Sequence, residues 1–233
     1  MQHRHARKAG ATCAITGAAL LFVGTYLHPM EANPNETVAA FTEYAADDFW
    51  VASHLMQLAG VASMVAALLF LTTVLEARRG PGIARVAAGG TIVSLALATA
   101  LQAVDGIALK NMVDAWAAAP ASQKGEVFHA AFAVRQIEVG LASMLSLSFG
   151  LTVTLYGVAL IGSRIYPKWF AALAMASGVP TIASGVVMAY SGFSGLSMAI
   201  NMSASAIFLV WMLTLGVLMW RQDGVPLDDE TSV

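Results

Sequence analysis

The amino-acid sequence predicts an all-α, polytopic transmembrane bundle with six spans and two short extracytoplasmic interfacial helices. Hydrophobic residues make up 58% of the 233 positions and charged residues only 11%, whereas a soluble domain carries about 25% charged residues. The apolar stretches are long and do not alternate with a period of two. Helices, not barrel strands, are therefore expected to cross the bilayer.

We expect one transmembrane domain over residues 1–233. Its spans fall at approximately 9–28, 49–76, 83–109, 126–163, 169–190 and 196–220, and a short tail follows at 221–233. The fourth apolar stretch is too long for a hydrocarbon layer of about 30 Å, so its first turns should stand outside the membrane. In the fifth span, Pro180 predicts a kink.

Lysine and arginine residues predict the orientation of the spans. Nine of these residues lie at one set of span ends, only Lys110 and Lys124 lie at the other, and Arg135 falls inside the fourth span. Because the number of spans is even, both termini are predicted to be cytoplasmic, which makes the tail cytoplasmic as well.

Two connections on the extracytoplasmic side are long enough to hold helices of their own. In the first, Asn33, Pro34 and Glu36 have the spacing of a capping box, which predicts a helix over 34–46. In the second, 110–125, an amphipathic stretch is broken by Pro120. Both segments are expected to lie along the outer interface and to cover the bundle.

Polar residues inside the spans converge at one depth. Counting about twenty residues inward from the cytoplasmic end of a span reaches the outer edge of the hydrocarbon. In five spans that count ends at or near His28, His54, Gln57, Gln102, Asp105, Arg135, Glu138 and Asn201. Ionisable groups inside a membrane are costly, so they are candidates for function.

Helical phase predicts that these groups face the interior of the bundle. Residues at four-residue steps form stripes of small side chains on the third and fourth spans: Gly90, Ser94, Ala98 and Gln102, and Glu138, Ala142, Ser146, Gly150 and Thr154. Small side chains let helices approach closely, so such a stripe packs against other helices and does not face lipid.

The leading functional interpretation is a pocket on the extracytoplasmic side that binds a small or lipophilic molecule, with acid–base chemistry left open. The candidate catalytic residues are His54, Asp105 and Glu138, and the candidate ligand-binding residues are Arg135, Gln57, Gln102, Asn201 and His129. Arg135 would hold an anionic or carbonyl group. Asp105 or Glu138 would accept a proton, with His54 as partner.

Two other classes of function stay open. Arg135 could pair with Asp105 or Glu138 only to tie two spans together, as in a structural or assembly protein. A proton-coupled transporter would use the same carboxylates and the helix that Pro180 interrupts. It would also need a second opening toward the cytoplasm, where the inner halves of the spans are apolar. Whether the protein is an enzyme stays undecided.

The cofactor is unknown from the sequence. His54, Asp105 and Glu138 could offer one nitrogen and two oxygens to a metal ion, but no metal-binding residue is assigned. A bis-histidine haem is not favoured, because His54 and His129 differ in height by several turns. Expected partners are membrane lipid and a small or lipophilic ligand. No basic block suggests nucleic acid, and a homo-oligomer stays open.

Four short segments resemble uncharacterised small bacterial multi-pass membrane proteins that are grouped as domains of unknown function. They are Leu27-His28-Pro29, Trp50 to His54, Val104-Asp105-Gly106 and Tyr166-Pro167. The resemblance covers the spans in outline. It implies a location in a bacterial plasma membrane and supplies no activity and no catalytic residue.

Overall fold

The computed structural model describes residues 2–77 and 82–221, and most of them are helical. The helices in this part of the chain are α1 (Gln2–Tyr26), α2 (Thr37–Ala46), α3 (Trp50–Ala77), α4 (Ile83–Gln102), the π-helix η1 (Ala103–Leu109), α5 (Lys110–Ala118), α6 (Lys124–Ser163), α7 (Lys168–Ser191) and α8 (Gly195–Arg221). Six helical stretches within these residues are long and apolar enough to cross a membrane. The predicted all-α fold with six spans is confirmed.

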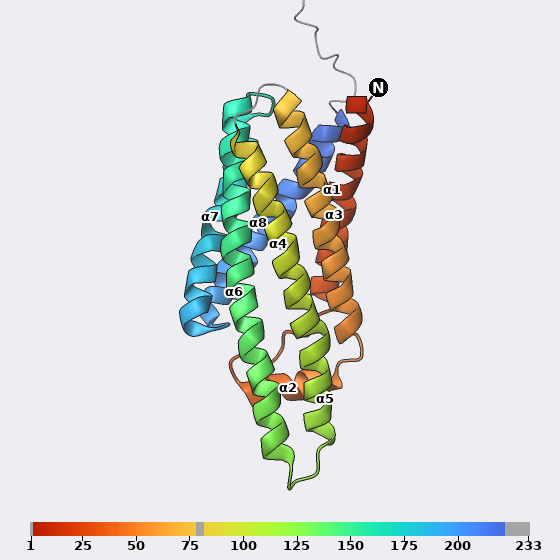
Figure 1. Ribbon diagram of the computed structural model, residues 1–233, viewed down its shortest axis with the longest axis vertical. Helices are drawn as coiled ribbons and strands as arrows, with labels where there is room; N and C mark the ends of the chain where they lie inside the picture. The colour runs from red at the N-terminus through yellow and green to blue at the C-terminus, as the bar shows by residue number, and fades with distance from the viewer. Residues whose placement is uncertain (1, 78–81, 222–233) are drawn as a thin grey trace, which may run out of the picture.

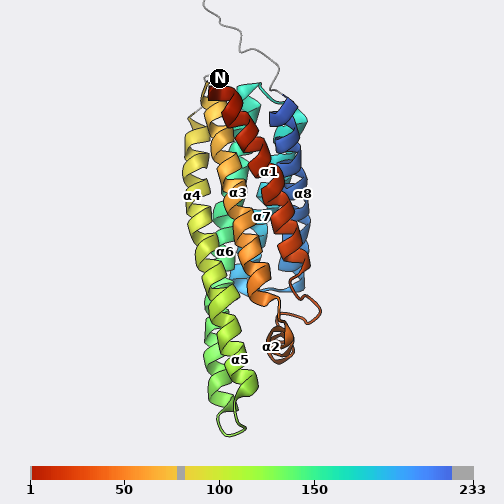
Figure 2. The ribbon, with the colours of Figure 1, turned by 90° about the vertical axis from the view of Figure 1, so that its right-hand side faces the viewer.

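The six spans form a closed ring. Helix α1 packs against α3, α3 against α4, α4 against α6, α6 against α7 and α7 against α8, and α8 packs back against α1. Figures 1 and 2 show these helices side by side, with the start of α1 and the end of α8 at the same end of the bundle. We call this the α1 end and the opposite end, where α2 lies, the α2 end.

Helix α2 begins at Thr37, later than the predicted start at Pro34. The preceding residues form a turn in which the Asn35 backbone N–H donates to Asn33 Oδ1 (3.1 Å) and the Glu36 N–H donates to the Asn33 carbonyl (2.9 Å). The side chain of Asn33 therefore stabilises a turn before the helix. This local competition between turn and helix is common for asparagine.

The sequence had suggested that the second connection forms a separate helix along the outer interface. The structure shows a different course for this segment. Residues Lys110–Ala118 continue the direction of α4 through the π-helical segment η1, so that one helical stretch runs from Ile83 to Ala118. Figures 1 and 2 show α5 and the first turns of α6 extending together beyond the other spans, while α2 lies across the bundle. The start of α6 projects as expected.

The α2 end has a hydrophobic core of its own. Buried side chains from α2, α3, η1, α5 and α6 meet there, among them Phe41, Tyr44, Trp50, Leu109, Val113 and Trp116. The Lys110 ammonium donates to the carbonyls of Tyr44 (3.0 Å) and Ala45 (3.1 Å) in the last turn of α2. A cation at a helix C-terminus interacts favourably with the helix dipole, so Lys110 holds α2 in place.

The α1 end is filled by a larger core. Its biggest buried side chains include Leu68, Leu71, Tyr156, Phe170 and Trp211. The Tyr156 hydroxyl lies 2.8 Å from Thr72 Oγ1 and donates to the Leu68 carbonyl, while the hydroxyl of Thr91 donates to it. Polar groups in this half of the bundle therefore bond to one another across α3, α4 and α6.

Helices α6 and α7 approach closely at two glycines. A Cβ atom added to Gly150 would lie 2.7 Å from the carbonyl oxygen of Gly178, and a Cβ added to Gly178 would lie 2.7 Å from the Gly150 carbonyl oxygen. Nearby, Ser143 Oγ donates to the carbonyl of Gly185 at 2.9 Å. The small-residue stripe predicted on the fourth span thus lies in a helix–helix contact at Gly150.

The substitution Gly150→Leu is expected to destabilise the protein by about 1–3 kcal/mol, the usual cost of overpacking a tight contact. The leucine side chain would separate α6 from α7. Gly140→Leu is the matched control, because Gly140 lies on the same helix and a Cβ there meets nothing within 4 Å. Thermal unfolding in lipid nanodiscs measures both, and equal melting temperatures for the two variants would contradict the close packing.

Candidate functional site

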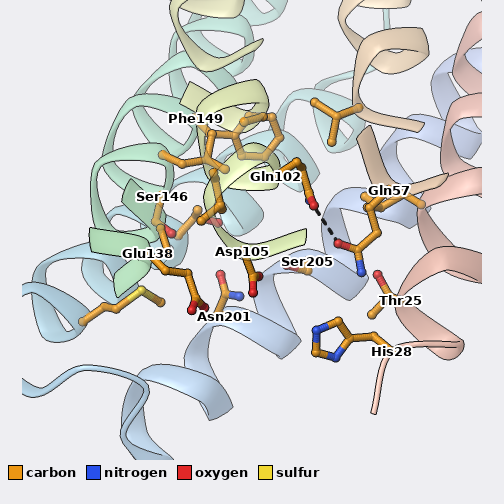
Figure 3. Close-up of a pocket in the computed structure, with 18 of the residues that line it drawn as sticks. Thr25, His28, Gln57, Gln102, Asp105, Glu138, Ser146, Phe149, Asn201 and Ser205 are labelled. Atoms are coloured by element: carbon orange, nitrogen blue, oxygen red, sulfur yellow. Dashed lines mark hydrogen bonds between the residues drawn. The ribbon is translucent and has the colours of Figure 1, made fainter. Parts of the chain in front are cut away.

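A cavity of about 420 Å³ lies at the centre of the ring. Every one of the six spans contributes to its wall. The apolar part of the lining includes Val61, Met64, Leu68, Leu145, Phe149 and Phe208, and the polar part includes Thr25, His28, Gln57, Gln102, Asp105, Arg135, Glu138, Ser146 and Asn201. Figure 3 shows the His28 ring, the Asn201 amide and the carboxyl groups of Asp105 and Glu138 directed into one space.

Asp105 lies on the π-helical segment and pairs with His54 on α3. His54 Nε2 is 3.1 Å from Asp105 Oδ2, and the His54 side chain is 2% exposed. Gly106 lets the two elements meet, because a Cβ atom there would lie 2.7 Å from His54 Cβ. The Trp50 indole donates to the Asp105 carbonyl at 3.1 Å, which fixes the segment against α3.

His28 completes a cluster that the sequence did not predict. It follows α1, and its ring packs at a tilt against the rings of Trp50 (centroids 4.8 Å apart) and His54 (4.9 Å). Burial, together with His54, lowers the pKa of His28 below its ordinary value of 6.5, although Asp105 and Asp47 act in the opposite direction. This shift favours the neutral form of the imidazole. In the sequence, the only indication of this role was the position of His28 along its span, which puts it at the same membrane depth as the polar residues of the other spans.

Arg135 and Glu138, one turn apart on α6, form a buried ion pair. Arg135 Nη1 donates to both carboxylate oxygens of Glu138 at 2.7 Å, and Nη2 donates to the Pro34 carbonyl (3.3 Å) and the Tyr44 hydroxyl (3.4 Å). The guanidinium also lies over the ring of Phe193, 4.7 Å from its centroid. Arg135 thus connects α6 to the loop before α2, to α2 and to the connection between α7 and α8.

Tyr44 is the residue of α2 that reaches this pair. Burial raises the pKa of Tyr44 to about 12, although the nearby Arg135 acts against the shift. The phenol therefore keeps its proton at any physiological pH. It accepts a hydrogen bond from the guanidinium, and its ring packs at a tilt against Trp50, with centroids 4.3 Å apart.

The remaining predicted residues separate into two groups. Gln57, Gln102 and Asn201 line the cavity, and Gln102 Nε2 donates to Gln57 Oε1 at 3.1 Å (Figure 3). His129 does not line it. This histidine is exposed on the projecting start of α6, where its ring meets Phe128. The phase difference from Arg135 along the helix accounts for its distance from the cavity.

The donor atoms that lie close enough to hold one metal ion are not the three considered from the sequence. Among the described residues, His28, His54 and Asp105 each place one nitrogen or oxygen within 4.8 Å of the others. Glu138 is not part of this group, and both of its oxygens accept hydrogen bonds from Arg135. The site can therefore offer hydrogen bonds from amides, two carboxylates held by different partners, and imidazole nitrogens.

Six apolar spans around one partly polar cavity define a multi-pass helical membrane protein. The chain belongs to the family described as Domain of unknown function (DUF4386), whose profile matches residues 8–216. No curated protein and no solved structure matches the chain. The matched residues reach into all six spans, but the family description gives no activity, so the function must be argued from the site itself.

Proposed function

We propose that this protein binds a small amphipathic molecule in its central cavity, with the apolar body among the spans and an uncharged oxygen-bearing head toward the α2 end. The observation that carries the proposal is one cavity with apolar walls and a polar end, bordered by every span. Ligand sites of this kind have volumes of about 300–1,000 Å³ and a few polar groups that orient the ligand. The cavity volume of about 420 Å³ falls in that range.

An uncharged head fits because the charged side chains at the polar end hold one another. The guanidinium of Arg135 is engaged by Glu138, and the Asp105 carboxylate lies against His54. No cation in this cluster is left to hold an anion. The amides of Gln57, Gln102 and Asn201 can both donate and accept hydrogen bonds, which suits a hydroxyl or carbonyl group. Gln102 Oε1 is buried with no hydrogen-bond partner.

Access from the α2 end follows from the way the two ends are filled. At the α1 end, large core side chains and the hydrogen bonds of Tyr156 occupy the interior. Near the α2 end, the cavity wall includes Pro29, Met30, Ala32 and Pro34 from the loop between α1 and α2. This arrangement supports binding from the α2 end.

The charges of the sequence support an orientation with the α1 end in the cytoplasm of a bacterial cell. Arg85, Arg164, Lys168 and Arg221 lie at the ends of spans on the α1 side. Lysine and arginine collect on the cytoplasmic side of bacterial plasma membranes. In this orientation, the polar end of the cavity faces the extracytoplasmic side and both termini face the cytoplasm.

A series of ligands that differ only in their head group tests this proposal. Dodecanol, dodecane and dodecanoate are added to metal-free protein in lipid nanodiscs, and thermal unfolding is followed with native mass spectrometry as a second readout. A ligand that binds the folded protein raises its melting temperature. Dodecanol is expected to bind one molecule per chain, with an affinity about tenfold higher than that of dodecane or dodecanoate, which corresponds to about 1.4 kcal/mol.

Equal effects of the three molecules would contradict the proposal, because the protein would then show no preference for a hydroxyl head group. Failure of dodecanol to saturate at one molecule per chain would contradict it as well. Tighter binding of dodecanoate would show that an anionic head is preferred, against the assignment of an uncharged one.

A further inference from the structure

We propose that His28, His54 and Asp105 form a site for a divalent first-row transition metal, with zinc as the ion that best fits the donors. Two imidazoles and one carboxylate are a common ligand set for zinc and for non-haem iron. Their donor atoms lie within 4.8 Å of one another, and His54 Nε2 is 3.1 Å from Asp105 Oδ2. This inference goes beyond the proposed function and does not depend on it.

The ring of His54 presents the nitrogen that a metal needs. Its Nδ1 lies 2.7 Å from the backbone carbonyl of Trp50, one turn earlier on α3. A carbonyl only accepts hydrogen bonds, so Nδ1 carries the hydrogen. In the neutral ring, the lone pair is then on Nε2, which faces Asp105. Histidines that bind metals usually donate the other ring N–H to a carbonyl or carboxylate in this way.

His28 has the same arrangement. Its Nδ1 lies 2.7 Å from the carbonyl of Pro29, so that Nδ1 is the donor and Nε2 again has the lone pair. The ring lies 4.9 Å from the His54 ring, centroid to centroid. Two histidines from different parts of the chain therefore have the tautomer and the backbone partner that metal ligands require.

A plain histidine–aspartate pair leaves part of this geometry unexplained. His54 Nε2 and Asp105 Oδ1 are buried atoms with no hydrogen-bond partner. A lone pair on Nε2 that faces a carboxylate oxygen at 3.1 Å is repulsive unless a proton or a metal cation lies between the two atoms. A single proton would satisfy His54 and Asp105, but it gives no reason for the third donor, His28, to converge on the same point.

The distances fit a metal with a small adjustment. Zinc–ligand bonds of about 2.1 Å in a tetrahedral site hold the ligand atoms about 3.4 Å apart. The 3.1 Å separation of His54 Nε2 and Asp105 Oδ2 is close to this value. His28 would move by about an ångström, and it lies just beyond the end of α1, in the loop that leads to α2.

Three protein ligands leave a zinc ion with one open position. His28 and Asp105 both line the central cavity, so that position faces the cavity. Structural zinc sites have four protein ligands, whereas sites that bind water or another small molecule keep one position open. The cavity therefore provides room for an oxygen-bearing group at the metal.

Titration with cobalt and zinc tests the site directly. Untagged protein in nanodiscs is treated with a chelator and then titrated with Co²⁺, which gives visible absorption bands in a tetrahedral site with nitrogen and oxygen ligands. One Co²⁺ per chain is expected, displaced by Zn²⁺ and not by Mg²⁺. Because no alcohol is present, the result is independent of the head-group series.

Variants assign the ligands. His28→Gln, His54→Gln and Asp105→Asn are each expected to lower zinc affinity by about 10- to 100-fold or more, since even groups that only support a metal ligand have effects of this size. His129→Gln, on the exposed start of α6, is the matched control and should leave the affinity unchanged. A His3→Gln/His5→Gln variant controls for binding at the N-terminal histidines.

The proposal is overturned if chelated protein takes up no Co²⁺, or if zinc affinity falls in the N-terminal control and not in His28→Gln. Circular dichroism checks that each variant is folded. His28→Gln is the decisive variant, because His28 lies outside the helices and its loss leaves the His54–Asp105 contact in place.

Discussion

Replacing Arg135 with methionine is expected to lower the free energy of unfolding by about 3–5 kcal/mol, the usual cost of leaving a buried charge without its partner. Glu138 is 2% exposed, and both of its oxygens accept hydrogen bonds from the Arg135 guanidinium. The substitution also removes the donors to the Pro34 carbonyl and the Tyr44 hydroxyl. Denaturation in mixed micelles, followed by circular dichroism, measures the change.

Two further variants distinguish the cost of an unpaired buried charge from the cost of lost side-chain packing. Arg135→Met/Glu138→Met removes both charges and should recover much of the stability, because a buried ion pair can often be replaced by apolar side chains of similar volume. Arg85→Met breaks the contact with Glu76, which is an exposed pair with 78% exposure of the arginine side chain. That variant should cost at most about 1 kcal/mol. If the Arg135 and Arg85 single variants lost equal free energy of unfolding, burial would not determine how much the Arg135–Glu138 pair contributes to stability.

The substitution Ala98→Phe is expected to weaken the binding of dodecanol by about a hundredfold, which corresponds to roughly 2.7 kcal/mol. Ala98 is buried on α4 and lines the central cavity. A phenyl group at this position would occupy the space of the ligand and replace its apolar contacts. Native mass spectrometry and the alcohol-dependent rise of the melting temperature measure the loss.

Ala100→Phe is the matched control for this substitution. Ala100 is exposed on the same helix, two positions further along, so its side chain points away from the interior of the helix bundle. It should leave the binding of dodecanol unchanged. If both variants bind dodecanol as the parent protein does, the alcohol is not held in the central cavity.

The spans were predictable because they depend on composition and length, which the sequence states directly. Depth counting also placed Gln57, Gln102, Asp105, Glu138 and Asn201 near one another, since each span must cross the same thickness of hydrocarbon. All five line the central cavity. Their roles in binding or catalysis stay predictions.

Helical phase left the pairing of the charged groups open, with His54 as partner of Asp105 or Glu138 and Arg135 as partner of either carboxylate. A count at 3.6 residues per turn assumes a regular α-helix, but Asp105 lies in the π-helical segment Ala103–Leu109. A π-turn contains an additional residue and rotates the side chains that follow. Asp105 therefore meets His54 on α3, while Arg135 bonds to Glu138 on its own helix. The sequence left both pairings of Arg135 open.

His28 was placed at the right depth but was given no role in the site, for a different reason. Its place depends on the path of the chain after α1, which folds back so that the ring meets Trp50 and His54. Tertiary contacts, and no local pattern, determine such a position. The course of α5 was missed in a similar way, because Lys110 looked like the end of a span. Its ammonium is instead bound by the carbonyls of α2.

The packing of α8 against α1 makes assembly of the ring a late event in biogenesis. Spans enter the membrane as they are synthesised, and helices associate after insertion. Until α8 has been inserted, α1 and α7 lack the neighbour that each contacts in the finished ring. The wall that carries Asn201 and Phe208 is also absent until then. A nascent chain that has not yet released its sixth span therefore lacks the α8 side of the cavity wall.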